Sequence, residues 1–170
     1  MSGLILLLDC VDERLFHAVL LRRRPRLDLF MRLITRLADP AVAIALAGGL
    51  AAGVVPALAR AGRVAFATMV LSHLLVQLLK RTISRARPSL PVGFDSLIRA
   101  PDRFSFPSGH SAAGLSVFLP LALVAPFWLG VPLLLLGMAV GASRSYLGVH
   151  YPGDVLAGWL LALASMAVLV

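Results

Sequence analysis

The sequence predicts an all-α fold: a polytopic membrane helix bundle of about five transmembrane helices, preceded by an N-terminal amphipathic helix. Composition is the first reason. Hydrophobic residues make up 59% of the 170 residues and charged residues 14%, with a mean hydropathy of +0.91, which is too apolar for a soluble domain of this length. The second reason is that the apolar residues fall in uncharged runs of roughly 16 to 20 residues, close to the ~20 that a helix needs to cross about 30 Å of hydrocarbon.

The chain begins with a basic, amphipathic segment. Residues 12–37 mix apolar side chains with seven arginines, which predicts a helix that lies in the membrane interface and is broken near Pro25. We therefore expect an N-terminal interfacial segment at residues 1–37 and a transmembrane domain at residues 38–170. The sequence does not decide whether the first element lies on the membrane or crosses it, so six spans are an alternative to five.

Five uncharged runs follow, and each is expected to form a transmembrane helix. Asp39 precedes the first run as an expected N-cap, and Pro126 separates the third run from the fourth as a hairpin. The expected spans are residues 40–59, 64–79, 110–125, 127–143 and 155–170.

The charge distribution indicates the partners. A net charge of +8 and a pI of about 11.4 would suggest a nucleic-acid partner in a soluble protein. Here the basic residues flank apolar spans, in the N-terminal segment and in the loop at residues 80–103, so anionic lipid headgroups are the expected counterpart and nucleic acid is not. Cys10 is the only cysteine, which excludes an internal disulfide. The oligomeric state stays open.

Six charged or titratable side chains lie at the ends of these runs. Alternating spans place all six at one membrane face. A charge is costly at the centre of a bilayer, so their collection near one interface predicts a shared site. These residues are Lys80 and Arg87 after the second run, His110 at the start of the third, Arg144 at the end of the fourth, and His150 and Asp154 before the fifth.

The residue types suit a phosphate ligand. The guanidinium forks of Arg87 and Arg144 bind phosphate oxygens in bidentate fashion, and Lys80 adds a point charge. Ser108 and Gly109 stand where the third run begins, so backbone N–H groups and the helix dipole add anion-binding donors there. Three fixed cations can do the electrostatic work that other phosphoryl-transfer enzymes assign to magnesium, so we expect no metal and no other cofactor.

The same residues lie in three short motifs: K-x6-RP from Lys80, PSGH at residues 107–110, and SR-x5-H-x3-D from Ser143. In this order and spacing they resemble the signature of the type 2 phosphatidic acid phosphatase superfamily, whose membrane members remove phosphate from lipids. The resemblance covers about residues 35–170. It implies a metal-independent membrane phosphatase whose substrate is a lipid phosphate or diphosphate of the phosphatidic acid, phosphatidylglycerol phosphate or polyprenyl phosphate class.

The resemblance also implies a role for each residue. His150 attacks phosphorus to form a phosphohistidine, Asp154 holds its imidazole, and His110 protonates the departing oxygen. The expected catalytic residues are therefore His150, His110 and Asp154, and the expected phosphate-binding residues are Lys80, Arg87, Ser108, Gly109 and Arg144.

Two other classes of protein would also gather basic residues at one interface: a lipid transporter or scramblase, and an inactive relative that only binds headgroups. Neither needs a paired nucleophile and acid, so His110 and His150 favour the enzyme. The Arg, Ala and Leu bias suggests a bacterial plasma membrane, and the membrane face that carries the site stays open. Arg85 is expected in a loop, and Asp95 and Asp102 are expected to be solvated.

Overall fold

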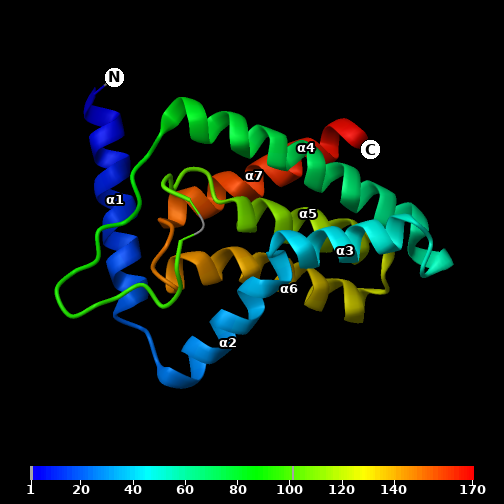
Figure 1. The fold of residues 1–170 in the computed structure, drawn as a ribbon, viewed down its shortest axis with the longest axis horizontal. Helices are drawn as coiled ribbons and strands as arrows, with labels where there is room; N and C mark the ends of the chain where they lie inside the picture. Colours follow the sequence, from blue (N-terminus) through cyan, green and yellow to red (C-terminus); the bar gives the residue numbers. More distant parts are fainter. Residues whose placement is uncertain (1, 101) are drawn as a thin grey trace.

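The computed structural model describes residues 2–100 and 102–170, with side chains described from Asp9 onwards. This part of the chain is helical and contains no strand. Figure 1 shows α4, α5, α6 and α7 running side by side, with α1 near one end of the bundle. The helices are α1 (Ser2–Leu20), α2 (Pro25–Thr35), α3 (Pro40–Ala51), α4 (Ala59–Ile83), α5 (Gly109–Val124), α6 (Phe127–Tyr146) and α7 (Pro152–Leu169), with short 3₁₀ helices η1 (Arg36–Ala38) and η2 (Pro56–Leu58).

Proline and glycine set several of the helix boundaries. Pro40 and Pro152 stand in the first turn of α3 and α7, where a missing N–H leaves no bond unmade and the fixed φ favours the helix. Gly53 (φ +88°) and Gly148 (φ +85°) follow α3 and α6 in left-handed conformations that glycine adopts without strain. The turn at Gly148 brings the chain from the end of α6 directly to His150 and the start of α7.

α5 lies at the centre of the bundle and packs against α4, α6 and α7. Small residues allow the close approach. A Cβ atom at Gly114 of α5 would lie 2.9 Å from Val140 of α6, and one at Gly158 of α7 would lie 2.5 Å from the carbonyl oxygen of Ser108. The start of α5 therefore sits directly against the first turns of α7.

Within the described residues, three helices are long and apolar enough to cross a membrane: η2 with α4 (Pro56–Ile83), α6 and α7. α5 is apolar but shorter, with 16 residues, or about 24 Å of helix. The second to fifth apolar runs predicted from the sequence are thus confirmed as helices. The number of spans stays a prediction.

The first predicted span, residues 40–59, is wrong in its extent. α3 has only 12 residues, which make about 18 Å of helix, because the chain turns at Gly53 before η2 begins. α3 has the length and apolarity of a span only when joined to residues Pro25–Ala38, and the two pieces meet at a bend of 54°.

The N-terminal segment is helical with a break at the predicted place, since α1 ends at Leu20 and α2 begins at Pro25. Its interfacial position and the division between residues 37 and 38 stay predictions. Its side chains reach the rest of the molecule: Phe16 is fully buried, and Asp12 Oδ1 accepts a hydrogen bond of 2.7 Å from the N–H of Gly153 in α7.

Candidate active site

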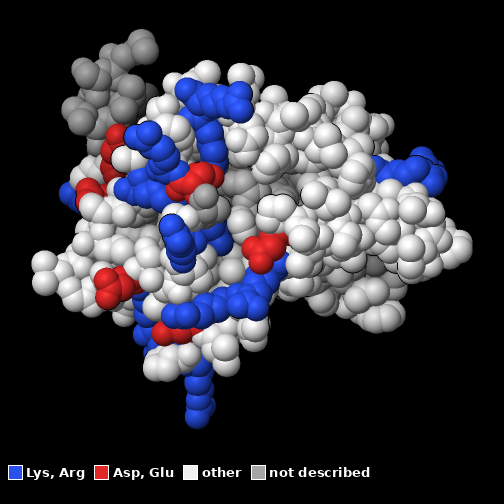
Figure 2. Space-filling model, in the orientation of Figure 1, with Lys and Arg blue, Asp and Glu red and all other residues white. Residues whose placement is uncertain are grey.

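Four helix ends meet the loop of residues 84–108 at one end of the bundle (Figure 1). α4 and α6 end there, and α5 and α7 begin there. Figure 2 shows acidic and basic side chains gathered at this end, whereas the opposite end of the face shown is largely uncharged. The structure therefore brings the residues predicted from the sequence to one end of the bundle, in a few connected clusters.

His150 lies in the loop before α7 and is almost fully buried. Its Nε2 atom lies 3.2 Å from Arg87 Nη1. Because a guanidinium can only donate, Nε2 accepts and carries the free lone pair, so the proton sits on Nδ1. Nδ1 is 3.6 Å from Asp154 Oδ2, which is longer than a hydrogen bond but close enough to orient the ring. Nε2 is thus the atom placed to act as a nucleophile.

The pKa of His150 is lowered to about 4. Burial is the largest cause, the carboxylate of Asp154 opposes it, and the guanidinium groups of Arg144 and Arg87 lower the pKa further. His150 is therefore neutral at physiological pH, as a nucleophile must be.

Asp154 is fully buried in the first turn of α7, where its Oδ2 accepts a hydrogen bond of 2.8 Å from the N–H of Tyr151. Its Oδ1 accepts one of 2.7 Å from Arg85 Nη1. Arg85 also pairs with Asp12 at 2.8 Å and Asp9 at 3.0 Å. Burial alone would lower the pKa of Arg85, but the Asp154 and Asp12 carboxylates raise it above its usual value. Arg85 is therefore the fixed counter-ion of Asp154.

Lys80 and Arg87 share one carboxylate. Asp102 Oδ2 lies 2.5 Å from Lys80 Nζ, and Asp102 Oδ1 lies 2.8 Å from Arg87 Nη2. Arg87 also donates to the carbonyl oxygen of Val149 at 2.6 Å, which ties the loop to the segment before His150. Asp102 thus lies where the two cations would otherwise bind an anion.

His110 and Arg144 line a cavity of about 260 Å³. His110 Nε2 lies 3.1 Å from Asp39 Oδ1, and Arg144 Nη1 donates to Thr35 Oγ1 at 2.9 Å. Arg144 is 2% exposed, and its buried Nε–H has no partner among the described residues.

The start of α5 differs in part from the expectation. The Ser108 N–H donates to the carbonyl oxygen of Asp154 at 3.0 Å, and the Ser108 hydroxyl caps α5 by accepting from Ser111 N at 3.3 Å. The Ser108 N–H is therefore already bonded and joins α5 to α7. Gly109 and His110 occupy the first turn of α5, whose N–H groups have no partner within the helix.

Three contacts were missed or misjudged from the sequence. Asp39 stands at the N-cap position of α3 as expected, but its side chain makes no capping hydrogen bond and pairs with His110 instead. Asp102 is exposed, as expected, but its bridge between Lys80 and Arg87 was missed. Arg85 is in a loop as expected, yet it also contacts Asp154.

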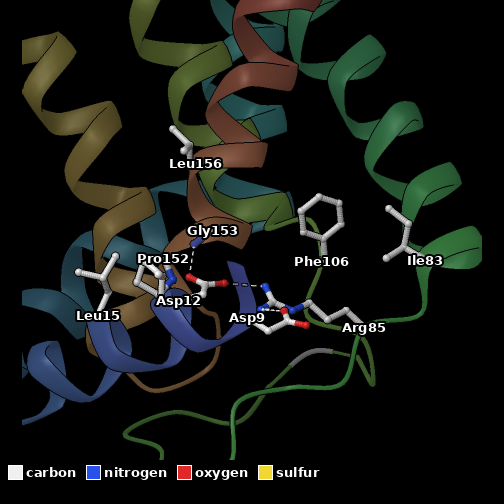
Figure 3. Close-up of a pocket in the computed structure, with 10 residues that line it drawn as sticks. Asp9, Asp12, Leu15, Ile83, Arg85, Phe106, Pro152, Gly153 and Leu156 are labelled. Carbon is white, nitrogen blue, oxygen red and sulfur yellow. Dashed lines mark hydrogen bonds and ion pairs between the residues drawn. The ribbon is translucent and has the colours of Figure 1, made fainter. Parts of the chain in front are cut away.

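A larger cavity of about 620 Å³ lies beside α1 and the start of α7, and Figure 3 shows its lining. Apolar side chains such as Ile83, Phe106 and Leu156 form most of it. Its cation, Arg85, is already paired with Asp9 and Asp12, as the dashed lines in Figure 3 mark. The smaller cavity at His110 is therefore better suited to an anion.

Comparison with known proteins identifies the family. A family model described as the PAP2 superfamily matches residues 61–170. The chain belongs to the PAP2 superfamily. The matched segment contains all three sequence motifs, so the family predicted from them is confirmed. The helical membrane fold predicted from composition and the apolar runs is confirmed as well.

Its relatives are membrane lipid phosphatases by name. Lipid A 1-phosphatase of Rhizobium johnstonii is 40% identical over 102 residues, which cover 57% of this chain and 41% of the relative. Phosphatidylglycerophosphatase B of Bacillus subtilis is 32% identical over 163 residues, which cover 89% of this chain and 78% of the relative. The matches span less than half the length of the first three curated relatives, at 41%, 46% and 44%.

Two crystal structures share the fold of this PAP2 chain. The transmembrane PAP2-type phosphatidylglycerolphosphate phosphatase from Bacillus subtilis has a TM-score of 0.78 and 30% identity, covering 95% of this chain and 83% of that one. Aquifex aeolicus LpxE has a TM-score of 0.79 and 26% identity, covering 91% and 92%. The chain is an integral membrane protein of this fold.

Proposed function

We propose that this PAP2 protein hydrolyses a lipid phosphate or diphosphate through a phosphohistidine intermediate, without a metal ion. The observation that carries the proposal is the buried, neutral His150, whose Nε2 lone pair is directed at Arg87 beside Lys80 and Asp102. His110 stands at the start of a neighbouring helix, beside Arg144. The names of the relatives, which are phosphatases of lipid A, undecaprenyl diphosphate and phosphatidylglycerophosphate, support the same class of substrate.

In the first step, the Nε2 lone pair of His150 attacks phosphorus and forms an N–P bond while the bond from phosphorus to the leaving oxygen breaks. His110 gives its proton to that oxygen, so the lipid leaves as an alcohol or as a lower phosphate. Lys80, Arg87 and Arg144 neutralise the oxygens of the transferring group, whose charge is greatest in the transition state.

In the second step, a water molecule attacks the phosphohistidine and His110 accepts its proton. The N–P bond breaks, inorganic phosphate leaves and His150 regains its lone pair. Asp154 holds the proton on Nδ1 and stabilises the positive charge that the ring carries while phosphorylated. Arg85 keeps Asp154 ionised and in place through its contact of 2.7 Å.

Phosphate must displace Asp102 from Lys80 and Arg87 before it can approach His150. The displacement exchanges one anion for another, so the cations stay neutralised throughout. In the free protein, the Asp102 carboxylate lets the cations Lys80 and Arg87 stand together. We place the protein in a bacterial plasma membrane, as the Arg, Ala and Leu bias of its sequence suggests.

The test is release of inorganic phosphate by the purified full chain in detergent, over a panel of lipid phosphates and diphosphates with EDTA present. We expect turnover of at least one lipid, and loss of turnover in His150→Ala. His17→Ala is the matched control, since His17 lies in the last turn of α1 and its side chain forms no hydrogen bond or ion pair within the described part of the chain. No release from any lipid would favour a headgroup-binding or scramblase role, and release that requires added magnesium would contradict the metal-free mechanism.

A further inference from the structure

On the basis of the proposed function, we propose that the cavity at His110 binds a second phosphate group of the substrate, on the leaving-group side of the reaction. The substrate class is then a lipid whose leaving group is itself anionic, of which a lipid diphosphate is the simplest case. A lipid monophosphate with a neutral alcohol as its leaving group would leave this cavity without a counter-ion.

The charge of the cavity lining supports this assignment. Besides His110 and Arg144, the cavity is lined by Arg32 of α2, Arg36 of η1 and Arg99 of the loop. Asp39 is the one carboxylate in the lining, so four arginines face one negative charge. A single transferring phosphate is already provided with Lys80, Arg87 and Arg144, and it does not account for three more arginines.

These three arginines are free to bind. No carboxylate among the described residues lies within ion-pair distance of Arg32, Arg36 or Arg99, whereas Lys80, Arg85 and Arg87 are all paired. The three side chains are exposed, so solvent screens their mutual repulsion, and their guanidinium groups remain open to donate to a phosphate bound in the cavity.

The mechanism places the leaving group here. In-line displacement puts the nucleophile and the leaving oxygen on opposite sides of phosphorus. With His150 as the nucleophile, the leaving oxygen must face the acid His110, which lines this cavity. A volume of about 260 Å³ admits a phosphate group but no long hydrocarbon chain.

The chain attached to this second phosphate has an apolar path. Leu29 and Leu33 of α2 are 61% and 56% exposed and precede Arg36 by seven and three residues, so they share its side of the helix. A lipid anion can therefore place its phosphate among the arginines while its chain stays in the membrane alongside α2.

The test compares a polyprenyl diphosphate with the polyprenyl monophosphate of the same chain length, in neutral detergent micelles. We expect the wild type to have the higher kcat/KM for the diphosphate. In the double variant Arg36→Gln/Arg99→Gln, the ratio of the two kcat/KM values should fall by about tenfold, the loss expected for two partly screened charge-assisted contacts. The matched control is Arg60→Gln/Arg63→Gln, which removes two exposed arginines at the start of α4 and should leave the ratio unchanged.

A second arm separates substrate from bilayer lipid as the source of the anion. If the arginines only bind anionic headgroups, the ratio in neutral micelles should be the same for both proteins, and a difference between them should appear only when phosphatidylglycerol is added. That result would overturn the inference.

A third arm does not depend on turnover. Calorimetry should show that wild type binds inorganic pyrophosphate more tightly than inorganic phosphate and that the double variant loses the difference. An inactive wild type that retains this preference would remove the proposed function and keep the second-phosphate site. An active wild type without it would remove the site and keep the function.

Discussion

Asp102 lies where a phosphate group is proposed to bind, so Asp102→Asn should strengthen the binding of phosphate analogues. The carboxylate neutralises Lys80 and Arg87 at 2.5 and 2.8 Å. Burial tends to raise the pKa of Asp102, but the hydrogen bond and charge of Lys80, and then those of Arg87, hold that pKa below its usual range. Asp102 is therefore ionised at neutral pH and competes with an incoming anion.

The size of the effect follows from the exposure of the pair. The Asp102 side chain is 42% exposed, so each of its two ion pairs contributes only about 0.2–1 kcal/mol. Removing both lowers the competition by about 0.4–2 kcal/mol, and since about 1.4 kcal/mol is tenfold, vanadate should bind about 2- to 30-fold more tightly.

The assay is vanadate inhibition of phosphate release, supported by calorimetric titration with vanadate. Asp95→Asn is the control because it removes the same charge from the same loop, and the Asp95 side chain forms no ion pair within the described part of the chain. Vanadate binding that is unchanged or weaker in Asp102→Asn, compared with this control, would refute the idea that Asp102 occupies the phosphate position.

Three further predictions test the two histidines and their partners. The imidazole of His150 should titrate near pH 4, because burial and neighbouring guanidinium groups lower its pKa; the NMR signal that is absent from His150→Asn identifies it, and a midpoint near 6.5 would contradict the burial argument. Since this folded pKa lies below the unfolded value, the stabilisation is present above about pH 6.5 and is lost as the pH falls towards 4. Arg85→Gln should lower the free energy of unfolding by about 3 kcal/mol, measured by denaturation in detergent, because it leaves the buried carboxylate of Asp154 without its counter-ion; a loss no larger than that of Arg60→Gln would sink the claim. Asp39→Asn should slow hydrolysis of alkyl phosphates by about tenfold and of aryl phosphates much less, because a good leaving group needs less help from His110; equal losses on both would mean that Asp39 does not position the acid.

The fold followed from the sequence wherever apolar runs had clear ends. α4 to α7 contain the four later runs, because charged residues, Pro126 and the segment around His150 bound them on both sides. The first run failed for a local reason. Nothing in its composition shows that Gly53 adopts φ +88° and ends α3 after 12 residues. The residues on both sides of this turn are apolar, so hydropathy alone does not reveal it.

The sequence predicted which cations and histidines come together at the site, but it did not predict the positions of most of the carboxylates that pair with them. The cations and His110 lie within a few residues of a helix end, so the alternation of the helices is enough to bring them to one end of the bundle. These residues are Lys80, His110 and Arg144. The position of Asp102 depends on how the loop of residues 84–108 folds back over α4, which is a tertiary contact that no local pattern encodes.

The position of Asp39 at the site could also have been predicted from the alternation of the helices. If α4 ends at the site, then the apolar run before it must begin at the same face, and Asp39 stands directly at that beginning. The same reasoning applies to every charge at this end of the bundle: each cation in a low-dielectric setting needs an anion nearby. Arg85 and Arg87 have theirs in the protein. The arginines around His110 outnumber the carboxylates beside them, and Arg32, Arg36 and Arg99 are exposed, so solvent ions, the bilayer or a substrate can supply negative charge there. On the leaving-group side of the site, the positive side chains outnumber the carboxylates. A substrate with a second phosphate would bring negative charge to that side.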